Sequence, residues 1–251
     1  MRRIVKGIVL RETDSKETDK ILTVLTESEG KLPVIARGAR RRNSRIAAAS
    51  QLLTYSEMTL FQKGKWSILD EASVLEMFPG VRQDVELLAL GSYFAELSEL
   101  LAPEDLPVPE MLSLLLNALY ALGTLRKDQD QVKAAFELRL LSLSGFAPLL
   151  DGCAVCGREA PEKPVLDVTE GVLRCKRCGT GSMRTLTMPL CAASLQAMRY
   201  ALHCPAKRLY SFQLEGKAME RMAHCTEAFA AAQLERGFRT LDFYQKIRIK
   251  A

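Results

Sequence analysis

The first 80 residues contain short runs of apolar and β-branched residues, and turn-forming sequences separate one run from the next. Runs of this length and composition are typical of β-strands rather than helices. The five expected strands are Arg3–Leu10, Lys20–Thr26, Leu32–Ala36, Leu53–Gln62 and Trp66–Met77. Five short strands with one irregular connection predict a small closed or nearly closed β-barrel, because closure removes the exposed edges of a sheet.

The fourth expected strand alternates between apolar and polar residues, which puts every second side chain on the same face. The side chains expected on that shared face are Leu53, Tyr55, Thr59 and Phe61. Lys63-Gly64-Lys65 supplies the turn into the fifth strand, and Pro79-Gly80 ends the β-rich region.

Beyond residue 80 the apolar residues recur at the three-to-four-residue spacing of helices, and prolines and glycines interrupt the pattern. The expected helices cover residues 87–101, 111–125, 132–143, 192–202 and 211–233. A cysteine-bearing insertion at about residues 150–182 divides them. Helices on both sides of such an insertion can pack into one body, so a single all-α domain is expected from both groups.

The composition limits the class of protein. Of the 251 residues, 48% are hydrophobic, which is too many for a disordered chain and enough for a substantial core. No apolar run approaches the roughly 18 residues of a membrane span, and the basic start of the chain lacks the apolar stretch of a secretory signal. We therefore expect a cytoplasmic protein with no membrane partner. The net charge of +5 is too small to indicate a nucleic-acid partner by itself.

Four of the seven cysteines form two C-x-x-C pairs, Cys153 with Cys156 and Cys175 with Cys178, each followed directly by glycine. One C-x-x-C turn lets two thiolates reach the same ion, and two such turns complete the tetrahedral set of four cysteines that zinc accepts. The spacing predicts a zinc ribbon around one structural Zn²⁺. A catalytic zinc is disfavoured because it keeps an open position and usually includes a histidine or carboxylate.

Disulfides and an iron–sulfur cluster are the competing explanations for this motif. A reducing compartment disfavours disulfides, and the usual ferredoxin spacings differ from this one. Between the two pairs, residues 165–168 and 171–174 have the pattern of a short β-hairpin. The remaining Cys191, Cys204 and Cys225 lie on helical patterns and are expected to be buried, unreactive thiols.

Basic residues gather in an acid-free window between Glu29 and Glu57. They are Lys31, Arg37, Arg40, Arg41, Arg42 and Arg45. Arginine presents a planar fork of donors that matches phosphate oxygens, and the neutralised phosphates release counterions. The window predicts a surface that binds a polyanion at the end of the third strand. A solvated basic loop is the alternative.

The expected barrel carries three aromatic residues that bear on this choice, Tyr55, Phe61 and Trp66. A positive groove with aromatic faces for the bases is what proteins use to bind single-stranded nucleic acid. The same side chains equally suit the core of the barrel. The basic residues of the first strand extend the window only if they point to the same side, which the sequence does not fix. They are Arg2, Arg3, Lys6 and Arg11.

No motif in the sequence predicts catalysis. The two histidines, His203 and His224, lie in separate expected helices, and no Walker, G-x-S-x-G, H-E-x-x-H or deaminase motif is present. Glu12, Asp14 and Glu17 are an acidic trio, but Lys16 lies among them and Asp19-Lys20 follows, as in a charge-balanced loop, and no supporting constellation for a metal-dependent nuclease accompanies them. We therefore expect a binding protein without turnover.

Three stretches of the chain, taken together, carry a family resemblance. They are Lys6-Gly-Ile-Val-Leu-Arg11 with Glu17-Thr-Asp-Lys-Ile-Leu-Thr-Val-Leu-Thr26, then Lys31-Leu-Pro-Val-Ile-Ala-Arg-Gly-Ala-Arg-Arg41, and finally Ala135-Phe-Glu-Leu-Arg-Leu-Leu141 with Gly145-Phe-Ala-Pro148 and the first C-x-x-C pair. Their order and spacing resemble the RecO family of bacterial recombination mediators. The resemblance covers nearly the full chain and fades after about residue 185.

The resemblance implies that the barrel is an OB-fold, followed by a helical domain with an inserted zinc module. It implies binding of single- and double-stranded DNA, annealing of complementary strands and, with RecR, loading of RecA onto DNA coated by single-stranded DNA-binding protein. It maps DNA contact onto Gly38, Ala39, Arg40 and Arg41, and the zinc ligands onto the four paired cysteines. It also implies docking of the acidic tail of single-stranded DNA-binding protein, and a place at the nucleoid.

These features predict an α+β, multi-domain chain. An N-terminal OB-fold β-barrel is expected at residues 1–80, an all-α domain in two parts at 81–150 and 183–251, and an inserted four-cysteine zinc ribbon at 151–182. The function expected is that of a DNA-binding mediator of repair and recombination. Two alternatives stay open, namely a single-stranded RNA-binding protein with an OB-fold and zinc ribbon, and a nuclease or ligase accessory that uses a carboxylate metal site.

Overall fold

The computed structural model describes residues 2–64, 66–179 and 186–248. The chain divides into two compact units, of which the first consists of Met1–Leu125 and Phe238–Ala251 and the second of Arg126–Gly237. Lys65 of the expected turn and the expected boundary at residues 182 and 183 lie outside the described residues. The division into a barrel, two helical parts and a zinc module at the stated boundaries stays a prediction.

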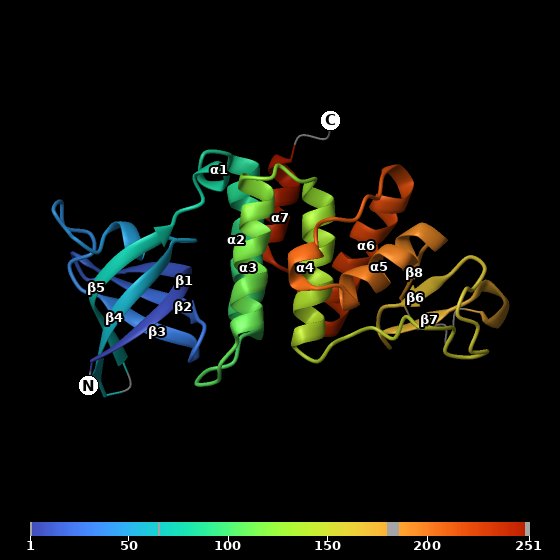
Figure 1. The fold of residues 1–251 in the computed structure, drawn as a ribbon, viewed down its shortest axis with the longest axis horizontal. Coiled ribbons are helices and arrows are strands. Elements are labelled where there is room, and N and C mark those ends of the chain that lie inside the picture. Colours follow the sequence, from blue (N-terminus) through green and yellow to red (C-terminus); the bar gives the residue numbers. More distant parts are fainter. Residues whose placement is uncertain (1, 65, 180–185, 249–251) are drawn as a thin grey trace. The chain divides into compact units, whose positions relative to one another are not determined.

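The first unit opens with the predicted barrel, in which five strands close in the order β1-β2-β3-β5-β4 (Figure 1). The strands are β1 (Arg2–Ser15), β2 (Asp19–Thr26), β3 (Gly30–Ala36), β4 (Tyr55–Lys63) and β5 (Trp66–Glu76). β1 pairs with β4 through its first half and with β2 through its second, and an irregularity between Val9 and Arg11 lets it bend around the barrel. A short parallel pairing of β3 with β5 closes the circle.

Strand alternation sorts the side chains of the barrel into an apolar interior and an outer face. The interior is filled by Val5, Val9, Leu22, Val24, Leu32, Val34, Met58, Leu60 and Leu69. On β4 the predicted shared face is only partly right, because Tyr55, Thr59 and Phe61 point outward while Leu53 is fully buried. Leu53 precedes the strand and has a φ of +57°, so the alternation of the strand does not extend to it.

Helices complete the described part of this unit. They are α1 (Pro79–Arg82), α2 (Val85–Leu101), α3 (Pro109–Gly123) and α7 (Arg239–Ile247). Asp84 caps α2 by accepting hydrogen bonds from two N–H groups of its first turn. α7 was not predicted from the sequence, and it is a short and mostly polar helix in which only Leu241 and Tyr244 are buried. It returns to α2, where Phe238 packs edge-on against Tyr93 and the N–H of Thr240 donates to Glu96 at 3.3 Å.

The second unit combines helices with a small sheet. Its elements are α4 (Gln129–Leu143), β6 (Val165–Asp167), β7 (Val172–Arg174), β8 (Thr187–Pro189), α5 (Ala192–His203) and α6 (Gly216–Leu234). The predicted hairpin is present as β6 and β7, and β8 adds a third strand beside β6. α6 begins later than predicted, because Gly216 has a φ of +52° and a helix from residue 211 cannot continue through it.

The predicted fold class is confirmed, since a closed N-terminal barrel is followed by a helical remainder that carries a cluster of four cysteines. Among the residues that the structure describes, no helix combines the length and the hydropathy that a membrane crossing requires.

Candidate nucleic-acid interface and metal centre

Residues 37–45 form the loop that follows β3, which we call the arginine loop. Its first turn needs glycine, since Gly38 has a φ of +66°. The N–H of Gly38 donates to Oδ1 of Asp19 at 2.8 Å, and this bond lowers the pKa of the Asp19 carboxyl. The N–H of Arg40 donates to the carbonyl oxygen of Thr18 at 2.9 Å. The arginine loop is therefore fastened to the turn between β1 and β2.

The side chains of the arginine loop differ in how much of their charge is available. All five arginines are exposed, namely Arg37, Arg40, Arg41, Arg42 and Arg45. The guanidinium of Arg40, however, lies 3.3 Å from Oδ2 of Asp14 and donates to the carbonyl oxygen of Glu17 at 3.3 Å. Arg40 consequently holds the loop in place and has fewer donors left for a phosphate.

Arg37 stands between two open hollows on the outside of the barrel. The first, of about 500 Å³, is lined by Lys16, Glu17, Thr18, Asp19, Arg37, Gly38 and Arg41. The second, of about 570 Å³, is lined by Arg2, Arg37, Phe61, Gln62, Lys63, Ile68 and Asp70. Lys16, Arg2 and Lys63 thus join the basic surface, although they lie outside the basic window of the sequence. The pairing of β1, β4 and β5 brings Arg2 and Lys63 to it, and the pairing of β2 with β3 brings the turn that carries Lys16.

Two of the three candidate aromatic side chains are accessible. Phe61 and Trp66 are 44% and 43% exposed, and both belong to the ribbon formed by β4 and β5. Cross-strand pairing puts Phe61 beside Arg2 on one side and beside Ile68 on the other. Tyr55 is half-buried, and the desolvation raises its pKa. Phe61 and Trp66 are therefore the better candidates for contact with a base.

Lys31, in contrast, lies apart from the arginine loop. It is at the beginning of β3, roughly 20 Å from Arg37 at the rise of a strand. Its Nζ donates to the carbonyl oxygen of Glu99 in the last turn of α2 at 2.9 Å, where the helix dipole favours a cation. Arg11 turns to the same helix and lies 2.8 Å from Oε1 of Glu99. These two side chains serve the contact between the barrel and α2.

Two members of the acidic trio of the β1–β2 hairpin form ion pairs with basic side chains. Glu12 pairs with Lys20, and Asp14 pairs with Arg40. Among the described residues, the one group of metal-ligating side chains close enough to share an ion is the set of paired cysteines.

The four predicted zinc ligands converge in the second unit. The Sγ atoms of Cys153, Cys156, Cys175 and Cys178 all lie within 4.8 Å of one another. Those of Cys156 and Cys175 are 3.8 Å apart. A tetrahedron with metal–sulfur bonds of about 2.3 Å has edges of about 3.8 Å, so the spacing fits one tetrahedrally bound ion.

Each C-x-x-C turn is shaped by the glycine that follows it. Gly157 and Gly179 have φ values of +70° and +77°, which favour glycine, as the sequence predicts. The N–H of Gly157 donates to the carbonyl oxygen of Cys153 at 2.8 Å, and the N–H of Cys175 donates to the Sγ of Cys153 at 3.3 Å. The backbone thus turns its donors toward the sulfur atoms.

These donors and the crowding of the sulfurs shift the acidity of the thiols. Burial raises the pKa of Cys153, but the N–H groups of Cys156, Val155 and Cys175 together outweigh it and lower that pKa to about 6. The sulfurs of Cys175 and Cys156 raise the pKa of Cys178 to about 12. Four crowded sulfurs do not all ionise without a cation among them, so the donor set fits a metal ion.

Arg199 of α5 fastens the cysteine module to the helices of its unit. Its guanidinium donates to the carbonyl oxygens of Leu150, Asp151 and Glu159 over distances between 2.6 and 2.8 Å. Of the three remaining cysteines, Cys204 and Cys225 are buried as predicted. Cys191 is only half-buried, because it caps the beginning of α5.

Comparison with known proteins identifies the family. Residues 1–78 match the family model described as recombination protein O N terminal, and residues 82–242 match the one described as recombination protein O C terminal. The chain belongs to the RecO family. Its resemblance to this family, stated from the sequence motifs, is confirmed along nearly the whole chain.

Three relatives that are each named DNA repair protein RecO illustrate the match. The relative from Acetivibrio thermocellus is 30% identical over 245 residues, which are 97% of either chain. That from Symbiobacterium thermophilum is 34% identical over 254 residues, again 97% of either chain. That from Desulforudis audaxviator is 32% identical over 247 residues, 98% of this chain and 97% of the relative. Membership of the RecO family gives this chain a role in DNA repair and recombination.

Proposed function

We propose that this chain is a DNA-binding recombination mediator that works without turnover chemistry. It binds single- and double-stranded DNA, anneals complementary strands and, with RecR, promotes the loading of RecA onto DNA coated by single-stranded DNA-binding protein. The observation that carries the proposal is the place of Arg37 between two hollows, with Lys16 and Arg41 in one and Arg2 and Lys63 in the other. A surface of this charge, beside an exposed aromatic ring, suits a polyanion with accessible bases.

Annealing follows from the electrostatics of such a surface. Two complementary strands repel each other, and a protein that neutralises phosphates without reading the sequence lowers the barrier to their encounter. The arginine loop offers guanidinium groups for phosphates and is not arranged as a base-reading element in a groove. We therefore assign it the phosphate contacts, through Arg37, Arg41, Arg42 and Arg45, with Arg40 and Lys31 in lesser roles.

The partners rest on family membership and on one physical argument. Removing a coating protein from DNA requires contact with that protein as well as with DNA, so a second surface for single-stranded DNA-binding protein, and one for RecR, belong to the proposal. We place the protein in the cytoplasm at the nucleoid, where these partners and DNA meet.

We further propose that the ion held by the four paired cysteines is one structural Zn²⁺ per chain. The support is the tetrahedral spacing of the donors and the fact that all four of them are sulfur atoms. Four cysteines fill the coordination of zinc, as in structural sites, whereas a catalytic site keeps one position open. Zinc there supplies a cross-link between the two C-x-x-C turns. The residues of the module then fold around it, because a segment of this size has too little core of its own.

Annealing of labelled complementary DNA strands, without nucleotide, tests the proposal. The wild-type protein is expected to accelerate duplex formation and leave the strands intact, and Arg37→Ala/Arg41→Ala is expected to lose most of that acceleration. Lys207→Ala/Arg208→Ala removes the same charge from exposed positions in the other unit and is expected to behave like the wild type. Absence of acceleration by the wild type, or magnesium-dependent shortening of the strands, would contradict the proposal. Preferential competition by RNA of the same sequence would favour the RNA-binding alternative instead.

A further inference from the structure

We propose that Phe61 and Trp66 form a base-stacking subsite for unpaired bases, separate from the arginine loop, and that this subsite sets a preference for single over double strands. The inference rests on the proposed DNA binding and adds to it which side chains touch the bases. It also adds what holds those side chains in position.

The register of the barrel places an apolar floor in the second hollow. Phe61 pairs across the strands with Ile68 of β5, and Ile68 pairs in turn with Ile35 of β3. Arg2 pairs with Phe61 from the other side. All four side chains point outward. Phe61 and Ile68 form the apolar floor of the hollow itself, and Ile35 extends the apolar surface beside it onto β3. An exposed phenylalanine with two isoleucines beside it is suited to the flat face of a base.

The charges around this floor separate phosphates from bases. Part of the charge of Arg2 is offset by Asp70, whose Oδ2 lies 2.6 Å from the Arg2 guanidinium. The remaining positive charge of the hollow therefore lies mainly at its rim, on Arg37 and Lys63. Trp66 pairs with Lys63 across the tight end of the ribbon, so the second ring lies next to this rim. A single strand fits this arrangement with phosphates on the rim and bases on the floor.

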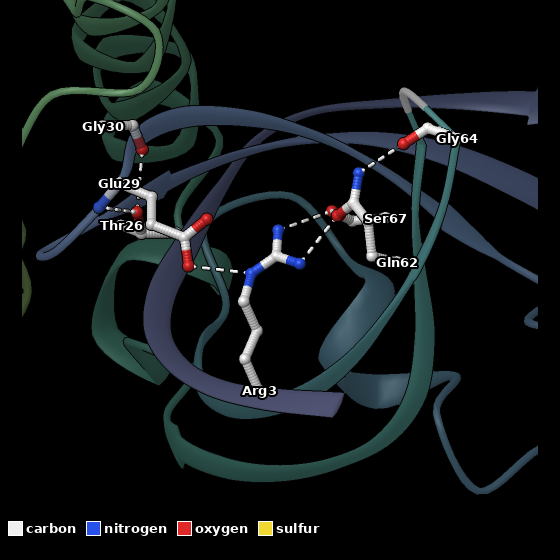
Figure 2. A network of polar contacts seen from close by, with 7 residues as sticks. All are labelled: Arg3, Thr26, Glu29, Gly30, Gln62, Gly64 and Ser67. Carbon is white, nitrogen blue, oxygen red and sulfur yellow. Dashed lines mark hydrogen bonds and ion pairs between the residues drawn. The ribbon is translucent and has the colours of Figure 1, made fainter. Parts of the chain in front are cut away.

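A network inside the barrel holds the ribbon that carries both rings. Figure 2 shows the guanidinium of Arg3 between Glu29 of the β2–β3 turn and two residues of the ribbon, Gln62 and Ser67. The distances from Arg3 to these three side chains are between 2.7 and 2.8 Å. Gln62 in turn donates to the carbonyl oxygen of Gly64 at 2.7 Å. Gln62 follows Phe61 and Ser67 follows Trp66, so Arg3 fixes the neighbours of both rings.

Fixing the ribbon in advance strengthens binding, because rings that are already in position lose little freedom when a base stacks on them. The same geometry discriminates against a duplex, whose bases are stacked inside the double helix and offer no free face. A duplex keeps only the phosphate contacts. Annealing consequently removes the base contacts from the product, and the protein holds its product less tightly than its substrate.

The test compares a thymidine oligonucleotide of about 20 nucleotides, longer than the ~4–16 nucleotides of one OB-fold site, with a duplex of the same length. Trp66 is the single tryptophan of the chain, so its intrinsic fluorescence reports on this subsite alone. We expect the oligonucleotide to quench Trp66 at saturation and the duplex to leave it nearly unchanged. Phe61→Leu and Trp66→Leu are each expected to weaken single-strand binding about tenfold, with duplex binding and the salt dependence unchanged.

Two control variants distinguish the stacking subsite from the proposed DNA binding on which it rests. Trp66→Phe keeps a ring and is expected to restore most of the single-strand affinity, while Phe243→Ala removes a ring that is 53% exposed on α7 and is expected to change neither affinity. If the wild type binds neither DNA, the proposed function is wrong. If the wild type binds both and the leucine variants keep its ratio of single-strand to duplex affinity, only the stacking subsite is wrong.

Discussion

Nη1 of Arg3 donates a hydrogen bond of 2.7 Å to Oε1 of Gln62, a residue 59 positions later in the chain. The bond joins the first strand to its neighbour β4, one of the two strands of the ribbon that carries Phe61 and Trp66. The same guanidinium reaches Glu29, whose N–H donates to Oγ1 of Thr26 at the end of β2 (Figure 2). The partly buried side chain of Arg3 therefore joins the β2–β3 turn, β4 and β5.

Arg3→Lys tests whether this arginine positions the ribbon. A lysine keeps the charge but cannot bond Glu29, Gln62 and Ser67 with a planar fork, so the ribbon loosens. We expect acrylamide to quench Trp66 more strongly and single-strand affinity to fall about fivefold, while the salt dependence of binding stays the same. Arg11→Lys, on the same strand but paired with Glu99, is the matched control. A variant that loses thermal stability yet keeps its ratio of single-strand to duplex affinity would show a purely structural role.

The basic residues of the sequence window are expected to contribute unequally to DNA binding. Arg37→Ala and Arg41→Ala should each reduce the slope of log affinity against log salt by about 0.7 for a single strand, the value for one lost phosphate contact. Arg40→Ala should reduce it less, because Asp14 already neutralises part of its charge. Lys31→Ala should reduce the slope least, because its amine is bound to α2. Equal effects from all four substitutions would contradict this ranking.

Cys175→Ser is expected to remove the metal and unfold the cysteine module without abolishing DNA contact. Loss of a structural ion lowers the free energy of unfolding by about 4 kcal/mol or more, which is beyond the range of ordinary substitutions. The measurements are zinc content by atomic absorption, expected to fall from one per chain to none, and chemical unfolding. Cys191→Ser is the matched control, since a serine caps the beginning of α5 equally well. Metal-free wild-type protein with unaltered stability would contradict the assignment.

The parts of the fold that depend on local pattern were accessible to sequence reasoning. Alternation and turn residues located all five strands of the barrel, since a period of two is unambiguous where one face is buried. The spacing of the cysteines located the cluster of four thiols, because a C-x-x-C turn brings its two sulfurs together whatever surrounds it.

The features of the site that depend on strand register and on packing could not be predicted from the sequence. Lys31 is close to Arg37 in sequence, yet an extended strand carries it to the other end of the barrel. Arg2 and Lys63 are far apart in sequence, yet the pairing of β1 with β4 brings them to one hollow. Which way Arg2 and Arg3 point is likewise decided by pairing, because one residue of shift exchanges the two faces of a strand.

Packing also buries an ion pair whose spacing in the sequence is that of an exposed pair on a helix. Lys133 and Glu137 are spaced by one helical turn on α4, a spacing typical of exposed pairs. Their side chains are instead 3% and 0% exposed, with Nζ of Lys133 lying 2.8 Å from Oε1 of Glu137 and 2.7 Å from Oε2 of Glu227 on α6. Thr226 donates to the other oxygen of Glu137 at 2.7 Å. This cluster joins α4 to α6 in the core of the second unit.

Removing one member of this cluster is expected to destabilise the second unit strongly. Burial alone disfavours the charged amine of Lys133, but the carboxylates of Glu137 and Glu227 outweigh it and raise its pKa above the ordinary value of 10.5. A raised pKa contributes stability that is fully present below that ordinary value and is lost only as the pH rises through the folded pKa. We therefore expect this contribution to be constant between pH 6 and about pH 9.

Glu137→Leu leaves the Lys133 amine short of a buried partner, and such a loss costs about 3–5 kcal/mol. Lys133→Met/Glu137→Leu removes both charges and fills the space with apolar groups, so it is expected to recover most of that stability. Glu227→Gln tests whether burial decides the size of the effect. Glu227 is 32% exposed, so this substitution should lower the free energy of unfolding less than Glu137→Leu does. Chemical unfolding of the three variants and the wild type at pH 7 makes the comparison. If the double variant is less stable than Glu137→Leu, the ion pair stabilises the unit in its own right, and the expectation that apolar packing replaces it is wrong.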